Sequence, residues 1–318
     1  MTKNFARCFG QDIMRGEHTI GGGVKTKQHV DGVLMKSDSG NDPSYYFKKQ
    51  QVEKKLGRSI TTEEFQLKYY EGPDTYESGT SIFDPVLCEL AYRWFCPPGG
   101  LVLDPFAGGS VRGIVAAKLG RKYVGIDLSA RQIEANMEQA ARICGNNKPL
   151  WHIGDSREID ALCPDVQADF IFSCPPYADL EVYSDNPQDL STMPYPVFLK
   201  AYQEIIKKSC ALLKENRFAC FVIGEVRDSK GHYYQFVPDT IKSFTACGLK
   251  YYNEAILVTA VGSLPIRVGR QFEAGRKLGK THQNVLVFIK GDAKKGTADI
   301  GPVEFGDISS EVLNAENP

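Results

Sequence analysis

The sequence predicts an α/β fold with a seven-stranded, mostly parallel sheet and helices on both faces. Three observations support this prediction. Short apolar runs alternate with stretches of helical periodicity from residue 81 to residue 291. The runs are bounded by turn residues and are apolar along most of their length, as strands covered on both faces are. The last two runs follow each other with no helical stretch between them, so one strand should be antiparallel.

Each element is justified by its own residues. Strands are expected at the apolar runs 101–106, 122–127, 149–155, 168–176, 217–226, 250–260 and 284–291. Helices are expected at the amphipathic stretches 81–95, 109–119, 129–145, 194–214 and 236–248. Asp84 before Pro85 is a suitable N-cap for the first helix, and Ser129 for the third. Gly120 ends the second helix.

The flanking segments have a different composition and divide the chain into three parts. Residues 1–78 form an N-terminal arm and helical extension, irregular at first and then charged, with two short helices expected in 45–70 and Ser59 at the start of the second. Residues 79–291 are expected to form the α/β domain. Residues 292–318 form a polar C-terminal tail.

Composition narrows the classes of function. The 318 residues carry 38 basic and 39 acidic side chains, so any contact with nucleic acid must come from a local patch. The nine cysteines form no CxxC pair, which disfavours a disulfide framework or a zinc site and favours a reducing cytoplasm. No apolar run is long enough to span a membrane, and the N-terminus lacks an apolar export segment.

The first candidate site is the turn after the strand at 101–106. Its small residues let the backbone turn sharply and let a ligand approach closely, and the acidic side chain can meet an ammonium or hydroxyl group. The alternative is a tight packing turn. The residues are Asp104, Pro105, Phe106, Ala107, Gly108, Gly109 and Ser110.

Two further carboxylates end the next two strands. Asp127, followed by Leu128, comes 23 residues after Asp104, and a carboxylate there can accept both hydroxyls of a ribose. The alternative for Asp127 is a charge that stabilises the helix N-terminus. The third of these strand-end motifs, which we call stations, consists of Gly154, Asp155 and Ser156, and its carboxylate can accept the amine of an adenine. The alternative is an aspartate in a surface loop. The full GxGxxG pattern is absent, which favours a nucleoside cofactor over NAD.

The fourth station follows the strand at 168–176 and consists of Ser173, Cys174, Pro175, Pro176 and Tyr177. Two prolines fix the backbone and leave carbonyl groups without competing amide donors. Such a carbonyl can accept a hydrogen of a base amine, and Tyr177 can stack on a base that has left the duplex. The alternative is a purely structural turn.

With these four stations in this order, the chain resembles S-adenosylmethionine-dependent methyltransferases that act on adenine N6 or cytosine N4 of DNA, with phage and bacterial DNA methylases the most similar. The resemblance covers about residues 80–291. It implies a Rossmann-like methyltransferase fold, S-adenosyl-L-methionine as cofactor and no metal. It implies that Phe106, Gly108, Asp127 and Asp155 hold the cofactor. The segment over its methionine end would contain Thr80, Ser81, Phe83 and Asp84.

Two departures from the family pattern bear on the chemistry. The loop reads FAGGS where the family has FxGxG, so Ser110 stands where glycine is usual. Cys174 stands where Asp, Asn or Ser is usual, and a thiol is a weak acceptor. By size Cys174 mimics Ser, which in this family accompanies cytosine N4. Its alternative role is a nucleophile that attacks cytosine during C5 modification.

The last expected strand is preceded by a basic, glycine-rich segment, for which we expect a flexible loop that contacts DNA phosphates. Its cations are Arg267, Arg270, Arg276, Lys277 and Lys280. The alternative is a solvated charged loop. The sequence thus predicts a cytoplasmic DNA methyltransferase of a bacterium or phage-infected cell, a monomer or homodimer, with or without a restriction enzyme. Methylation of RNA or protein amines, and a catalytically inactive nucleic-acid-binding protein, are the other candidates.

Overall fold

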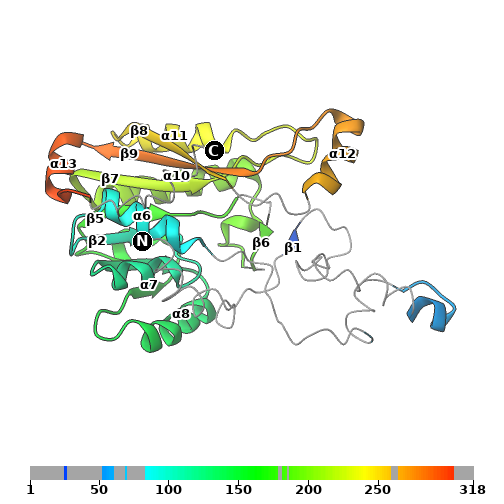
Figure 1. Ribbon diagram of the computed structural model, residues 1–318, viewed down its shortest axis with the longest axis horizontal. Coiled ribbons are helices and arrows are strands. Elements are labelled where there is room, and N and C mark those ends of the chain that lie inside the picture. Colours follow the sequence, from blue (N-terminus) through cyan, green and yellow to red (C-terminus); the bar gives the residue numbers. More distant parts are fainter. Residues whose placement is uncertain are drawn as a thin grey trace, which may run out of the picture.

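The computed structural model describes residues 25–26, 52–60, 69, 83–177, 181–184, 186–258 and 264–303. Its main body is one seven-stranded sheet with helices on both faces (Figure 1). The strands lie in the order β4-β3-β2-β5-β7-β9-β8. They are β2 (Leu101–Asp104), β3 (Lys122–Asp127), β4 (Leu150–Ile153), β5 (Ala168–Ser173), β7 (Leu213–Ile223), β8 (Lys250–Val258) and β9 (His282–Lys290). A separate two-stranded sheet pairs β1 (Lys25–Thr26) with β6 (Glu181–Val182).

The predicted fold class is confirmed, including the single antiparallel strand. Strands β2, β3, β4, β5 and β7 pair in parallel, whereas β9 is antiparallel to both β7 and β8. The carboxyl ends of the parallel strands therefore meet the start of β9 at one edge of the sheet. We call this the catalytic edge after the role predicted for it, because the four stations of the sequence pattern lie at the ends of strands that meet there.

Two helical layers cover the sheet. The helices are α6 (Pro85–Phe95), α7 (Val111–Lys118), α8 (Ala130–Ile143), α9 (Ile159–Leu162), α10 (Tyr195–Leu212), α11 (Phe236–Ala246), α12 (Leu264–Gly275) and α13 (Ala293–Ile300). Short 3-10 turns span Ser156–Glu158 and Leu190–Thr192. The N-caps Asp84 and Ser129 are confirmed, since each side chain accepts a backbone N–H of the helix that follows it.

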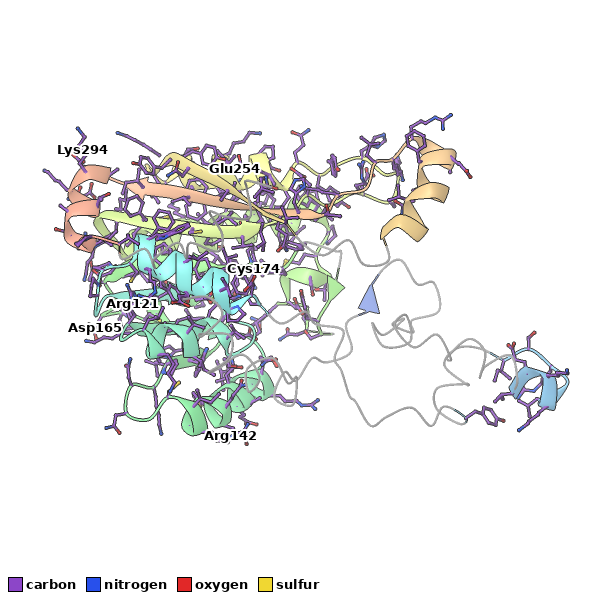
Figure 2. All side chains as sticks on the ribbon, in the orientation of Figure 1. Arg121, Arg142, Asp165, Cys174, Glu254 and Lys294 are labelled. Atoms are coloured by element: carbon purple, nitrogen blue, oxygen red, sulfur yellow. The ribbon has the colours of Figure 1, made fainter. Side chains whose placement is uncertain are left out.

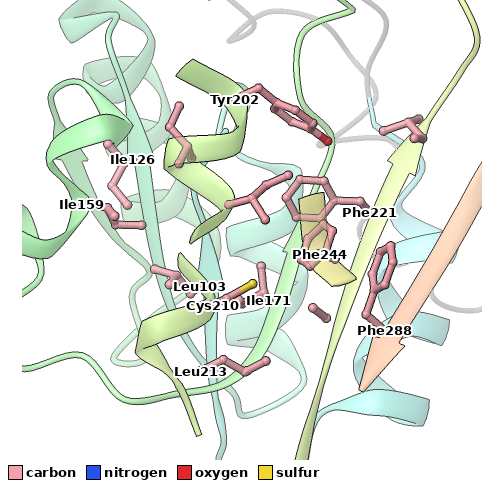
Figure 3. Packing of buried hydrophobic residues seen from close by; sticks show 14 of the residues in the cluster. Leu103, Ile126, Ile159, Ile171, Tyr202, Cys210, Leu213, Phe221, Phe244 and Phe288 are labelled. Atoms are coloured by element: carbon pink, nitrogen blue, oxygen red, sulfur yellow. The ribbon is translucent and has the colours of Figure 1, made fainter. Parts of the chain in front are cut away.

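Alternate residues of the strands supply two apolar cores. On one face Leu103 and Phe221 pack with α10 and α11, where Phe244 stacks on Phe288 with 4.1 Å between ring centroids (Figure 3). On the other face, Val102 and its neighbours pack against α6, α7 and α13. Each large apolar side chain buried in this way contributes about 1.5–3 kcal/mol to folding, so the sheet is a stable platform for its catalytic edge.

Two segments are helical where the sequence predicted a loop or a polar tail. Residues 264–275 form helix α12, although a flexible loop was expected there. Glycines suggested the loop, but the intervening run of Arg, Gln, Glu and Ala has high helix propensity. Residues 293–300, expected in the polar tail, form α13, which Asp292 caps and whose Ile300 is buried.

The N-terminal extension is described only in part. Residues 52–56 are helical, in agreement with the first of the two short helices expected there. The second, expected after Ser59, falls mostly on residues outside the described ones. Within the described ranges, none of the helices has both the length and the apolar character that a membrane span requires.

Candidate active site

The glycine-rich loop at residues 105–109, which we call the cofactor loop after its predicted role, turns from β2 into α7 and exposes bare backbone. Gly108 has φ +49°, a conformation that favours glycine, and a Cβ built on Gly108 or Gly109 would meet no atom within 4 Å. Two side chains hold Gly108 from behind: its N–H donates to Asp127 Oδ2 at 2.9 Å, and its carbonyl accepts from Asn136 Nδ2 at 2.8 Å. The loop is therefore rigid, with open space at its two glycines for a ligand to approach the main chain.

Asp104 anchors this loop from within the core and is completely buried. Its carboxylate accepts hydrogen bonds from Arg112 Nε at 2.5 Å, Tyr123 Oη at 2.7 Å and the backbone N–H of Phe106 at 3.1 Å. The same Arg112 donates through Nη2 to the carbonyls of Phe106 and Ala107 at 2.6 and 2.9 Å. Four protein donors thus surround Asp104 once Ser173 is added, so it acts as a structural anchor of the loop.

Arg112 was not singled out in the sequence, although it shapes the site. It is 5% exposed and also lies over the ring of Phe83, with 4.7 Å between the guanidinium carbon and the ring centroid. Phe83 in turn packs edge-on against Phe172 of β5 at 5.6 Å. Of the predicted residues, Phe83 therefore lies against Arg112 beneath the cofactor loop and Asp84 caps α6, while Thr80 and Ser81 lie outside the described residues.

Asp127 ends β3 beside the loop, as its spacing predicts. One carboxylate oxygen holds Gly108 and the other accepts the N–H of Ser129 at 2.8 Å. Burial raises the pKa of Asp127, although these two backbone hydrogen bonds oppose the shift. Each oxygen retains a second lone pair, so the carboxylate can still accept ribose hydroxyls. Leu128, next in the chain, is half-buried.

The third station closes the loop from the far side. The N–H of Gly154 donates to the carbonyl of Asp127 at 2.9 Å, and Ser156 Oγ donates to the carbonyl of Pro105 at 2.5 Å. Asp155 forms an ion pair with Arg157, whose Nη2 lies 2.5 Å from Oδ2. The buried Ser110 is bonded to Gln139 on α8. All three stations therefore meet around one loop.

The turn at residues 173–177, which we call the catalytic turn after its predicted role, leaves β5 next to β2. The register of the two strands pairs Leu103 with Ile171, and the hydroxyl of Ser173 donates to Asp104 Oδ1 at 2.5 Å. Ser173 is fully buried and points into the core, away from its neighbour Cys174, as strand alternation predicts. The cofactor loop and the catalytic turn are thus joined through a single side chain, Asp104.

Beyond Ser173, the turn presents Cys174, Pro176 and Tyr177, all half-buried, around a buried Pro175. Cys174 Sγ lies 3.7 Å from the hydroxyl of Tyr177, and that hydroxyl accepts a hydrogen bond from Gln283 Nε2 at 2.5 Å. Gln283 belongs to β9, more than a hundred residues further along the chain, so spacing in the sequence gives no indication of it. Figure 2 shows Cys174 at the catalytic edge.

The basic segment, which carries the predicted cations from Arg267 to Lys280, also starts from this edge, because it joins the end of β8 to the start of β9. Arg276 stacks on Phe272, with 5.0 Å from its guanidinium carbon to the ring centroid, and Lys280 Nζ donates to Asn284 at 3.4 Å. Lys277 is half-buried. The side chains of Arg267 and Arg270 are outside the described residues, although their backbone belongs to α12. Helix α12 projects from the body of the protein (Figure 1).

The described residues fit a nucleoside cofactor. Open backbone at Gly108 and Gly109, a carboxylate at Asp127 and a second one at Asp155 line one edge in the order that such a ligand requires. In the strand order, Asp127 lies between the loop after β2 and Asp155 after β4, so a nucleoside whose ribose is held by Asp127 would have the bare loop on one side and Asp155 on the other.

Comparison with known proteins gives a match to one family. The N6/N4 methyltransferase family of DNA methylases matches residues 36–138. The match includes the cofactor loop and Asp127, reaches back into the N-terminal extension, and ends before the catalytic turn. No curated protein gives a significant match.

Solved structures are similar at low sequence identity. TrmN from Thermus thermophilus is 16% identical over 65% of this chain and 48% of its own, with a TM-score of 0.44. Magnesium protoporphyrin IX methyltransferase from Synechocystis PCC 6803, solved with bound S-adenosylmethionine, is 10% identical over 77% of this chain and 97% of its own, with a TM-score of 0.44. A putative DNA modification methylase, also from Thermus thermophilus, is 17% identical over 50% of this chain and 56% of its own, with a TM-score of 0.33.

This chain spans about half the length of TrmN. The family match confirms the resemblance to DNA methylases and, at the level of the family, the predicted cofactor. The seven-stranded sheet with its one antiparallel strand is the fold that the resemblance implies. Fold and family match together support an S-adenosylmethionine-dependent methyltransferase that is similar to the DNA methylases.

Proposed function

We propose that this protein methylates an exocyclic amino group of a base in DNA, adenine N6 or cytosine N4, after the base has left the duplex. The observation that carries the proposal is the direct bond between Ser173 of the catalytic turn and Asp104 beneath the cofactor loop. Because the two motifs share one buried anchor, a base at the turn and a cofactor on the loop lie within one rigid frame. Such positioning is a major part of catalysis of group transfer.

The residues of the turn divide the work. S-Adenosylmethionine, when bound, supplies an electrophilic methyl group. The carbonyl of Pro175 accepts one hydrogen of the target amine, which localises the nitrogen lone pair for attack, and Cys174 lies beside it. The ring of Tyr177 stacks on the base and compensates for the stacking lost in the duplex. The chain needs no strong base, since the amine can lose its proton after transfer.

The substrate is held by cations at the same edge. Arg276, Lys277 and Lys280, with Arg267 and Arg270 of α12, contact the phosphates beside the target base. The presence of these residues on the connection between β8 and β9 supports this role, because that connection ends next to Gln283, which bonds Tyr177. A bacterial or phage-infected cell provides the cytoplasm and DNA that this activity requires, with or without a restriction enzyme.

The test is methylation of unmethylated genomic DNA, followed by digestion to nucleosides and mass spectrometry. We expect N6-methyladenine or N4-methylcytosine from the native protein and none from Tyr177→Ala. A matched control is Tyr252→Ala, which removes a half-exposed tyrosine of β8. Parallel reactions with RNA and with protein extract serve as competing substrates; methylation of either, with none of DNA, contradicts the proposal.

The variant Cys174→Ser decides between the two roles of the thiol. Serine keeps the size and polarity of the side chain but is a much poorer nucleophile than a thiol in this chemistry. If Cys174 only lies beside the target amine of the base, we expect measurable activity and the same methylated base from the variant. C5-methylcytosine from the native protein, abolished in Cys174→Ser, would replace the amine mechanism by nucleophilic attack on the ring.

A further inference from the structure

We propose that a hairpin of residues 227–233 is a second DNA-binding surface, which holds the sugar-phosphate backbone near the target base. The proposal rests on DNA being the substrate and extends it to a part of the chain that no motif marks. Its elements are two cations of the hairpin, Arg227 and Lys230, the exposed ring of Tyr233, and Lys277, which reaches the turn from outside the hairpin. None of these except Lys277 belongs to the basic segment.

The hairpin emerges at the catalytic edge. It connects the end of β7 to the start of α11, and β7 is the parallel neighbour of β5. The register pairs Phe221 with Ser173, so Ile223, the last residue of β7, lies level with the catalytic turn. A polymer whose base enters the turn must therefore pass close to the hairpin.

The hairpin has a defined conformation. Arg227 and Tyr233 form an antiparallel bridge, and the N–H of Asp228 donates to the carbonyl of His232 at 2.8 Å. Asp228 also accepts the N–H of His232 at 2.8 Å, and Gly231 turns the chain with φ +92°. The hairpin is thus preorganised, which reduces the entropy lost when a partner binds.

Its cations are held in place without being neutralised. The guanidinium carbon of Arg227 lies 3.8 Å from the ring centroid of Tyr233, and its Nη1 donates to the carbonyl of Gly231 at 2.7 Å. The ammonium of Lys277 packs against the turn, since a Cβ built on Gly231 would collide with Lys277 Nζ. Among the described residues, no carboxylate forms an ion pair with Arg227, Lys230 or Lys277.

This chemistry favours nucleic acid over other polyanions. A planar guanidinium binds phosphate oxygens in a bidentate manner, and stacking on Tyr233 fixes its orientation. Tyr233 is 42% exposed, which leaves ring surface for a sugar or an unstacked base. Lys277, which follows α12 in the chain, packs against the turn at Gly231, so the hairpin adjoins the basic segment.

The test measures binding of fluorescein-labelled unmethylated duplex DNA by anisotropy, between about 50 and 200 mM NaCl. The triple variant Arg227→Gln, Lys230→Gln and Lys277→Gln removes the proposed phosphate-binding cations. We expect it to bind at least about tenfold more weakly at the higher salt. The slope of log K against log salt is negative, and its magnitude should decrease by about 0.9 for each phosphate that the variant no longer neutralises. Tyr233→Ala should weaken binding about fivefold or more at an unchanged slope.

The control is a second triple variant with the same change of charge at the opposite edge of the sheet. Lys250 begins β8 there, and Lys294 and Lys295 lie on α13; all three are exposed. We expect Lys250→Gln, Lys294→Gln and Lys295→Gln to bind almost like the native protein. Circular dichroism and thermal melts check that both triple variants are folded.

Three results would overturn the inference. The hairpin variant could bind with the affinity and salt slope of the native protein, or no more weakly than the control variant. A stronger loss of affinity for single-stranded RNA than for duplex DNA would assign the surface to RNA. Failure of the native protein to bind DNA at all is a different result, because it contradicts the proposed function before the hairpin is considered.

Discussion

Replacement of Arg112 by leucine tests the central feature of the site, the buried anchor under the cofactor loop. Arg112 and Asp104 are 5% and 0% exposed, and their side chains approach to 2.5 Å. Leucine removes the cation but leaves the carboxylate of Asp104 in the core. It also removes the donor that the carbonyls of Phe106 and Ala107 share. The variant therefore damages both the anchor and the loop above it.

The expected loss of stability follows from the stranded charge. Removal of one partner of a buried ion pair costs about 3–5 kcal/mol, because the remaining charge has lost its compensation. Tyr123 and Ser173 still donate to Asp104, which limits the cost to that range. Neutralising Asp104 as well should relieve the penalty. The double variant Arg112→Leu with Asp104→Asn is thus expected to be more stable than Arg112→Leu alone.

Urea unfolding followed by circular dichroism measures these differences. Arg131→Leu, which replaces an exposed arginine on α8, is the matched control and should change the free energy of unfolding by less than about 0.5 kcal/mol. Isothermal titration with S-adenosylmethionine should show weaker binding to Arg112→Leu, since its loop has lost two hydrogen bonds. A loss of stability below about 1 kcal/mol, or a double variant less stable than the single one, would refute the reasoning from a stranded charge.

Two more predictions concern other parts of the molecule. Burial alone would raise the pKa of Asp169, but hydrogen bonds, with that from Lys214 the strongest, lower it below its usual value. Its ionised form therefore stabilises the fold above about pH 4, and this contribution is lost as the pH falls through the lowered pKa. The variant Asp169→Asn should therefore make the melting temperature less dependent on pH in the acid range. A melting temperature with the same acid dependence as that of the native protein would contradict this. In the catalytic turn, Gln283→Leu and Tyr177→Phe should each lower kcat about fivefold, the value of one hydrogen bond, and their effects should not multiply; full multiplication in the double variant would show that Gln283 does not act through the hydroxyl of Tyr177.

The strands and the order of the four stations could be predicted from the sequence, because both depend on local pattern. Asp127 lies where its spacing after a glycine-rich turn predicts. The partners of these residues were missed, since side-chain direction and tertiary packing decide them. Arg112 reaches back from α7 to Asp104 at the end of β2, and Gln283 reaches Tyr177 from β9. Such interactions depend on strand register and side-chain direction, which a single sequence does not display.

In the segment between β8 and β9, by contrast, the local sequence pattern itself predicted a loop where the structure has a helix. Gly269 within α12 and Gly275 at its end favoured a loop, but a terminal glycine is compatible with a helix before it, and an interior glycine costs a helix only about 1 kcal/mol. The predicted phosphate contacts do not depend on this difference.

The buried contacts of the catalytic turn and the cofactor loop limit which parts of the chain can vary with the substrate. The catalytic turn and cofactor loop are joined by buried polar contacts, all of which meet at Asp104, and a change in either motif would strand a polar group. The hairpin at 227–233 and α12 lie outside this network and follow strands whose packing does not depend on their sequence. Either element can change its cations without disturbing the chemistry. Variation in substrate should therefore map to these two elements rather than to the turn or the loop.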